Sequence, residues 1–118
     1  MKSKTFFAVL AALGLLASCA HIDPHPMDMT RAIRSATTKA DHNALAQHYE
    51  KAAERMQAKA QEQKNQLAEY ETHGYYYGRQ TEDLKDHTQA LARIYQEAAD
   101  ANMSIAKSHR QMAEDAKQ

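Results

Sequence analysis

The sequence contains no tryptophan, one cysteine, two prolines and three glycines among its 118 residues. A lone cysteine excludes a disulfide bond within the chain. Three scattered glycines cannot build a phosphate-binding loop or a dinucleotide fingerprint, and no serine lies in a glycine-rich nucleophile elbow. We therefore expect a protein that is not an enzyme and that holds no organic cofactor.

The chain also lacks an excess of charge of either sign. Fifteen basic residues balance fifteen acidic ones, so nothing predicts the basic surface with which proteins bind nucleic acid. Both phenylalanines stand at the start of the chain, at Phe6 and Phe7. Alanine supplies most of the remaining apolar residues, so a monomer can bury only a thin core.

The first nineteen residues have the pattern of an export signal. Lys2 and Lys4 precede an apolar run over residues 6–16, which is shorter than the roughly 20 apolar residues that span a bilayer. The run ends in Leu-Ala-Ser-Cys at residues 16–19. This ending resembles the lipobox of bacterial lipoproteins, and the resemblance covers residues 1–19 only.

The resemblance implies a division of the chain and a location. Residues 1–18 would be the signal peptide, and Cys19 would receive the lipid anchor. More than one acyl chain on this residue gives a lasting attachment to the membrane. In such lipoproteins an aspartate directly after the cysteine favours the inner membrane. Ala20 at that position therefore implies the periplasmic face of the bacterial outer membrane. Residues 19–37 would form a tether with a short helix capped by Asp28.

An internal repeat organises the rest of the chain. The pattern Ala-Leu-Ala-x-x-Tyr-x-x-Ala-Ala occurs at residues 44–53 and again 46 residues later, at 90–99. Both copies lie in long stretches of strong helix formers without proline or glycine. We predict helices over about 38–72 and 81–117, joined by a loop at 73–80. A capping box from Thr38 to Asp41 would start the first helix, and Gly74 would end it in a left-handed conformation.

A heptad pattern in the second helix predicts the face that is buried. Positions separated alternately by four and three residues form this heptad stripe: Leu84, Thr88, Leu91, Tyr95, Ala98, Asn102, Ile105, His109, Met112 and Ala116. Beside it runs a column of alanines at every seventh residue, Ala92, Ala99, Ala106 and Ala113, which lets another helix approach closely.

The short connection makes the two helices antiparallel neighbours. The predicted fold is therefore all-α, a long coiled-coil-like hairpin over residues 38–118. A single hairpin with so many alanines buries little area. We expect a homodimer that forms a four-helix bundle, or docking on another envelope protein.

Histidines offer one candidate metal site. In a hairpin that turns near Tyr76, facing residues have numbers that add up to about 152, so His42 and His109 lie at one level. Met112 is one turn further along the same helix. Imidazole and thioether ligands suit copper, and histidine with a nearby carboxylate suits zinc. The alternative is that His109 is a polar residue that fixes the register of the two helices.

Three adjacent tyrosines mark the loop between the helices. Tyr75, Tyr76 and Tyr77 either form an exposed contact patch or fold back over the end of the thin core. From these observations we expect a lipid-anchored periplasmic protein that acts as an interaction or envelope-structural module. The alternative function is binding of copper or zinc near the open end of the hairpin.

Overall fold

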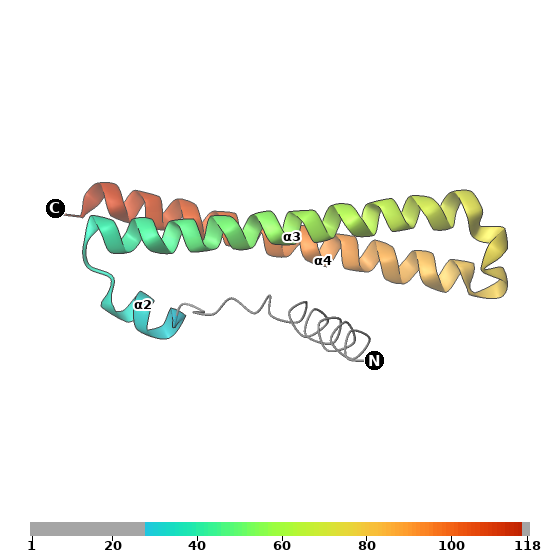
Figure 1. The fold of residues 1–118 in the computed structure, drawn as a ribbon, viewed down its shortest axis with the longest axis horizontal. Coiled ribbons are helices and arrows are strands. Elements are labelled where there is room, and N and C mark those ends of the chain that lie inside the picture. The colour runs from blue at the N-terminus through green and yellow to red at the C-terminus, as the bar shows by residue number, and fades with distance from the viewer. Residues whose placement is uncertain (1–27, 117–118) are drawn as a thin grey trace, which may run out of the picture.

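The computed structural model describes residues 28–116, and the predicted signal peptide and lipidation site lie outside this range. Two 35-residue helices, α3 (Lys39–His73) and α4 (Thr81–Asp115), pack against each other as an antiparallel hairpin. In Figure 1 they run side by side over their whole length, and α4 passes behind α3 near the middle. The predicted all-α hairpin is confirmed.

Local signals in the sequence set the starts of the first two helices. Asp28 caps the short helix α2 (Met29–Ser35) by accepting a hydrogen bond from the Arg31 backbone amide at 3.2 Å. The predicted capping box is also present at the start of α3. The Asp41 amide donates to the Thr38 hydroxyl at 3.1 Å, and the Thr38 amide donates to the Asp41 carboxylate at 2.9 Å. These hydrogen bonds satisfy amides that the first helical turn leaves without partners.

The loop consists of two short 3₁₀ turns, Gly74–Tyr76 and Gly78–Gln80. The prediction for Gly74 is wrong, because its backbone is right-handed, with φ −53°. Gly78 is the residue with positive φ, at 60°. Gly74 is needed for space instead, since a Cβ atom there would lie 2.7 Å from Cγ2 of Thr81. The Thr81 hydroxyl lies 2.6 Å from the Gly74 carbonyl oxygen and 2.8 Å from that of Gly78, and so ties the loop to α4.

Alanines form the contact between the two helices. On α4 the column at every seventh residue is buried throughout, and on α3 a matching column is buried at Ala46, Ala53 and Ala60. Residue numbers in the two columns pair at 152, as for Ala46 with Ala106 and Ala60 with Ala92. The small side chains of these two columns let the two main chains approach closely.

This packing corrects the predicted buried face of α4. Within the heptad stripe Thr88 is buried, but Leu91, Ile105 and Met112 are exposed. The close approach of the alanine columns places the larger side chains of the stripe at the edge of the interface rather than inside it. The hairpin therefore uses the alanines for its own fold and leaves much of its larger apolar surface at the rim.

Candidate functional site

A stripe of mainly apolar residues runs along the outside of α4. Its members alternate spacings of three and four residues and share one column, which begins at Leu84, with the predicted heptad stripe. We call them the outer stripe: Leu84, His87, Leu91, Ile94, Ala98, Ala101, Ile105, Ser108 and Met112. None of the nine is acidic, lysine or arginine. Leu91, Ile94 and Ile105 are 40%, 50% and 41% exposed.

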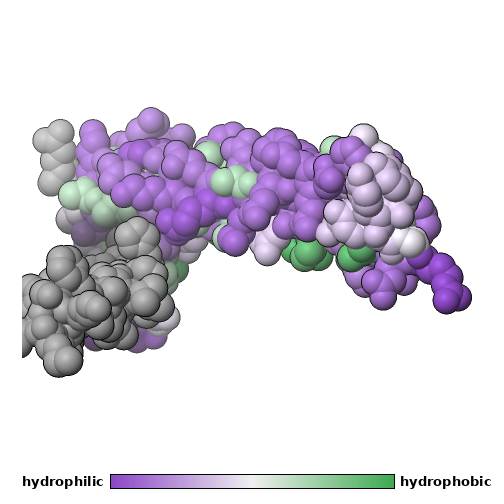
Figure 2. Space-filling model, turned by 45° about the vertical axis from the view of Figure 1, so that its right-hand side comes forward, coloured by the Kyte–Doolittle hydropathy of each residue, from purple (hydrophilic) through white to green (hydrophobic). Residues whose placement is uncertain are grey.

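The position of the outer stripe follows from helix geometry. Leu91 and Ile105 each precede a buried alanine by one residue, and one residue corresponds to about 100° around a helix. Figure 2 shows hydrophobic atoms along the lower edge of the hairpin towards its loop end, where α4 runs in Figure 1. The surface above that edge is mainly hydrophilic in the same view. Helix α4 thus has a packed alanine face and a second apolar face that nothing in residues 28–116 fully covers.

The repeat supplies an internal comparison for this surface. Positions 46 residues earlier, on α3, hold the equivalent set: Thr38, Asp41, Leu45, His48, Ala52, Arg55, Lys59, Glu62 and Gln66. Four of these nine residues are charged. The scaffold therefore does not require an apolar residue at these positions, and the apolar character of the outer stripe belongs to α4 alone.

His42 and His109 meet between the two helices, at the level the sequence predicts. Their Nδ1 atoms are 3.2 Å apart, and the two rings meet edge to edge, with centroids 5.4 Å apart and an interplanar angle of 24°. The ring of Tyr49 stacks on His109, with centroids 5.8 Å apart. Met112 lies one turn further along α4 and is 47% exposed. Within residues 28–116 no cluster of three histidine, cysteine or acidic side chains is arranged to hold a metal.

The contact between the two histidines depends on their protonation. A hydrogen bond between two Nδ1 atoms needs a proton on one of them and a lone pair on the other. Burial, and then the charge of His42 when it is protonated, lowers the pKa of His109. A histidine in the unfolded chain has a pKa of about 6.5. As the pH falls, it therefore binds a proton at a higher pH than His109 does in the folded chain. This contribution to stability is therefore present above pH 6.5, roughly, and is lost as the pH falls towards the lower folded pKa.

Arg110 joins the two helices on the side of the alanine columns opposite the histidine pair. Its Nε and Nη2 atoms donate to the two carboxylate oxygens of Glu50 at 3.0 and 2.9 Å, and Nη1 donates to Asn43 at 2.9 Å. The hydrogen bonds from Arg110 lower the pKa of Glu50. This contribution is lost only as the pH falls below about 4.3, well below the range of the histidine pair. Sequence reasoning missed this ion pair, because its residue numbers add up to 160 rather than 152.

The loop presents two of its three tyrosines to solvent. Tyr75 and Tyr76 are 71% and 72% exposed, and their ring centroids are 4.1 Å apart. Tyr77 is less exposed and packs edge-on against Tyr70, with centroids 4.9 Å apart. Tyr77 therefore packs against α3 through Tyr70, and Tyr75 and Tyr76 form a small exposed aromatic pair.

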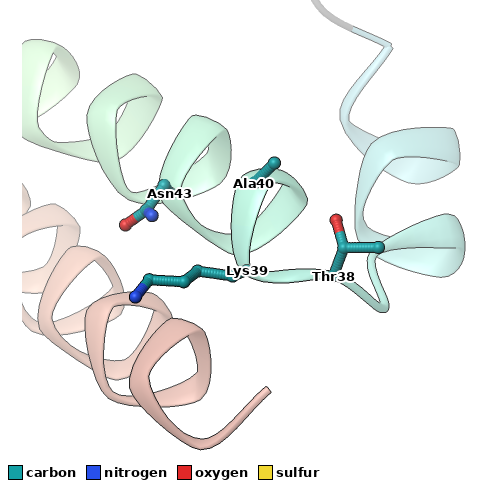
Figure 3. A pocket seen from close by; sticks show the side chains of 4 residues that line it. All are labelled: Thr38, Lys39, Ala40 and Asn43. Atoms are coloured by element: carbon teal, nitrogen blue, oxygen red, sulfur yellow. The ribbon is translucent and has the colours of Figure 1, made fainter. Parts of the chain in front are cut away.

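A shallow hollow of about 460 Å³ lies where the chain passes from α2 into α3. Thr38, Lys39, Ala40 and Asn43 line it, and Figure 3 shows the Lys39 side chain extending towards the last turns of α4. The Asn43 side chain already accepts a hydrogen bond from Arg110. The Thr38 hydroxyl is already hydrogen-bonded to Asp41, so the lining offers a ligand the Lys39 amine and the Asn43 amide nitrogen, and no pair of groups suited to acid–base or nucleophilic chemistry.

No family model, curated protein or solved structure matches the chain. No helix within residues 28–116 is long and apolar enough to cross a bilayer. The function is therefore argued from the surface of the hairpin and from the N-terminal sequence pattern.

Proposed function

We propose that this protein is a lipid-anchored, non-enzymatic interaction module that works at the periplasmic face of the bacterial outer membrane. In this proposal Cys19 carries the lipid, and residues 20–37 hold the hairpin away from the membrane. The α3–α4 hairpin then acts as a rod about 50 Å long that offers an apolar surface to another protein.

The observation that carries the proposal is the outer stripe. Large apolar side chains aligned along about four turns or more of an exposed helix are typical of surfaces that another helix covers. The alanine columns already hold the hairpin together, so the outer stripe is not needed for that contact. The exposed pair of Tyr75 and Tyr76 adds a second, smaller contact surface at the tip of the rod.

The anchor is tested by changing Cys19 to serine in the full chain. We expect the wild-type protein to incorporate an alkyne-labelled palmitate and to fractionate with the outer membrane. Cys19→Ser should lose both properties completely, because no other residue supplies the thiol. A control substitution, Ser18→Ala, keeps a small residue before the cysteine and should leave labelling intact. Membrane fractionation of Cys19→Ser at the wild-type level would contradict the proposal.

A second candidate function, binding of zinc or copper, is favoured by one distance. Two nitrogens bound to the same tetrahedral zinc ion lie about 3.3 Å apart, given Zn–N distances near 2.0 to 2.1 Å. The Nδ1 atoms of His42 and His109 are 3.2 Å apart. The two Nδ1 atoms face each other directly, so both rings would have to turn to direct their lone pairs at one ion, with Met112 as a thioether ligand for copper and solvent completing the site.

Thermal unfolding with added Zn²⁺ or Cu²⁺ tests the second candidate. Binding to the folded state should raise the melting temperature at pH 7.5, by about 4–8 °C for each kcal/mol of binding energy gained. The rise should disappear at pH 5.5, where protons compete for the same nitrogens. His42→Gln and His109→Gln should each abolish it, and His87→Gln, which changes an exposed histidine, should not. An equal rise in all three variants, or none in the wild type, would exclude this site.

A further inference from the structure

We propose that the outer stripe of α4 is the contact surface for a second copy of this chain, with the two α4 helices packed parallel and in register. This proposal rests on the proposed function and deepens it, because it names the partner, the helix that binds it and the orientation. Each copy would bring its own hairpin, so that two α3 and two α4 helices form a four-helix assembly with the α4 helices at its centre.

The length and the spacing of the outer stripe fit a coiled-coil contact. From Leu84 to Met112 it covers four heptads, or about 42 Å at 1.5 Å per residue. Leucine, isoleucine and methionine occupy four of the five positions in the Leu84 column, and Ile94 is the one large apolar residue among the four of the other column. A parallel, in-register pair places each of these side chains next to its own copy. No position of the outer stripe would then bring two carboxylates, two lysines or two arginines together, and His87 would meet its own copy near one end.

A second copy suits the outer stripe better than a charged or amphipathic foreign helix. The nine residues offer no charge that could attract a complementary charge on a partner. The equivalent face of α3 carries Asp41, Arg55, Lys59 and Glu62, so it would not pack on the outer stripe without burying charges. Helix α4 of another copy is therefore the surface of this chain that matches the outer stripe.

The residues that flank the outer stripe select the parallel orientation. On one flank lie Asp83 and Glu97; the other flank, which includes Thr88, Tyr95 and Asn102, is uncharged. In an antiparallel pair like flanks meet, which would place Glu97 next to its own copy. In a parallel pair the acidic flank meets the uncharged one. Attachment of both copies to one membrane through Cys19 also points both hairpins in the same direction.

Disulfide formation between introduced cysteines tests the orientation in the full-length, membrane-attached protein. Leu91→Cys and Ile105→Cys should each form a disulfide-linked dimer when expressed alone in an oxidising envelope, because each lies next to itself in a parallel pair. An antiparallel pair centred on Ala98 would instead link the two variants only when both are expressed together. The matched control is Lys59→Cys, the equivalent of Ile105 on α3, and it should stay monomeric.

A charge exchange at Ile94 separates loss of the interface from loss of the fold. Ile94 is half exposed, so Ile94→Glu and Ile94→Lys should both keep the helical circular dichroism of the wild type. Each variant alone should lose self-association at least about tenfold by sedimentation in detergent, because like charges would face each other. Mixing the two should restore a dimer that contains one copy of each.

The outcomes distinguish this inference from the proposed function. Three results would each overturn parallel pairing through the outer stripe. They are disulfides that form only between mixed variants, dimer formation by Lys59→Cys at the level of the α4 variants, and no association between the two Ile94 variants. Membrane fractionation of the Cys19→Ser variant is read separately. Failure of the anchor with intact α4 crosslinks removes the membrane role alone, and a stable anchored monomer removes the second copy alone.

Discussion

Substituting Ala60 by leucine should strongly destabilise the hairpin, although leucine is itself a good helix former. Ala60 is 1% exposed and lies opposite Ala92 in the alanine columns. A leucine there has no space unless the two main chains move apart. Overpacking of this kind costs about 1–3 kcal/mol, and each kcal/mol lowers the melting temperature by roughly 4–8 °C in a domain of this size.

The expected loss lies towards the upper end of that range, because separation of the helices affects more than one contact. The alanine columns run along both helices, so an enlarged spacing at Ala60 also loosens the packing at Ala53. Within residues 28–116, Leu45 is the only large side chain that is fully buried. Few other apolar contacts therefore exist to compensate.

The matched control for this change is Ala58→Leu. Ala58 is on the same helix, two residues away, and is exposed. Both substitutions have the same chemistry and nearly the same effect on helix propensity. Substitutions of exposed residues change the free energy of unfolding by about 0.5 kcal/mol or less, so Ala58→Leu should change the melting temperature by no more than about a degree or two. Equal melting temperatures for the two variants, measured by circular dichroism at a low protein concentration, would contradict alanine packing as the basis of the fold.

Much of the fold could be predicted because its signals are local. The absence of proline and glycine from two long stretches, the capping box at Thr38 and Asp41, and the glycines of the loop define the elements. The short loop then leaves only an antiparallel arrangement. Counting residues back from the turn also brought His42 and His109 together, since both helices rise by the same amount per residue.

The choice of buried face on α4 could not be made from the heptad pattern. Two adjacent columns, one of alanines and one that contains Leu91 and Ile105, are both apolar with the same period. Hydrophobicity favours the larger residues for the core, but close approach of the main chains favours the alanines. The fold resolves this competition in favour of the alanines, because α3 offers a matching alanine column and no matching column of large apolar residues.

Contacts made by long side chains were also beyond the reach of the sequence. Arg110 reaches Glu50 across the interface at an offset of about two turns from the level that simple counting gives, because its side chain extends along the helices. The role of Gly74 depends on how closely Thr81 approaches, which is a property of the folded loop. Neither feature has a periodic signal.

The duplicated sequence now has a clearer physical meaning. The parts that the two copies share, the alanine columns and one tyrosine per helix, build the hairpin. The parts that differ are the charged outer face of α3 and the apolar outer stripe of α4. The hairpin fold alone does not require these two faces to differ in character. The difference between them therefore supports a contact made by α4.

Substituting Leu45 by alanine is the other change for which we expect a large effect. Leu45 is 2% exposed, whereas Leu91, its counterpart in the repeat, is 40% exposed. The two copies of the repeat therefore bury the same position to very different depths. Loss of a fully buried leucine side chain costs about 2–5 kcal/mol, depending on how far the surroundings close over the cavity.

The comparison between Leu45→Ala and Leu91→Ala tests both the fold and the second copy. At a protein concentration where the chain is monomeric, Leu45→Ala should lower the melting temperature by roughly 10 °C or more, and Leu91→Ala should change it little. As the concentration rises and dimers form, the loss caused by Leu91→Ala should grow, because association through α4 stabilises only the wild type fully. The loss caused by Leu45→Ala should stay constant. Equal losses at low concentration would show that Leu45 and Leu91 are equally important to the monomer's core, and a loss for Leu91→Ala that is independent of concentration would place Leu91 within the hairpin's own core.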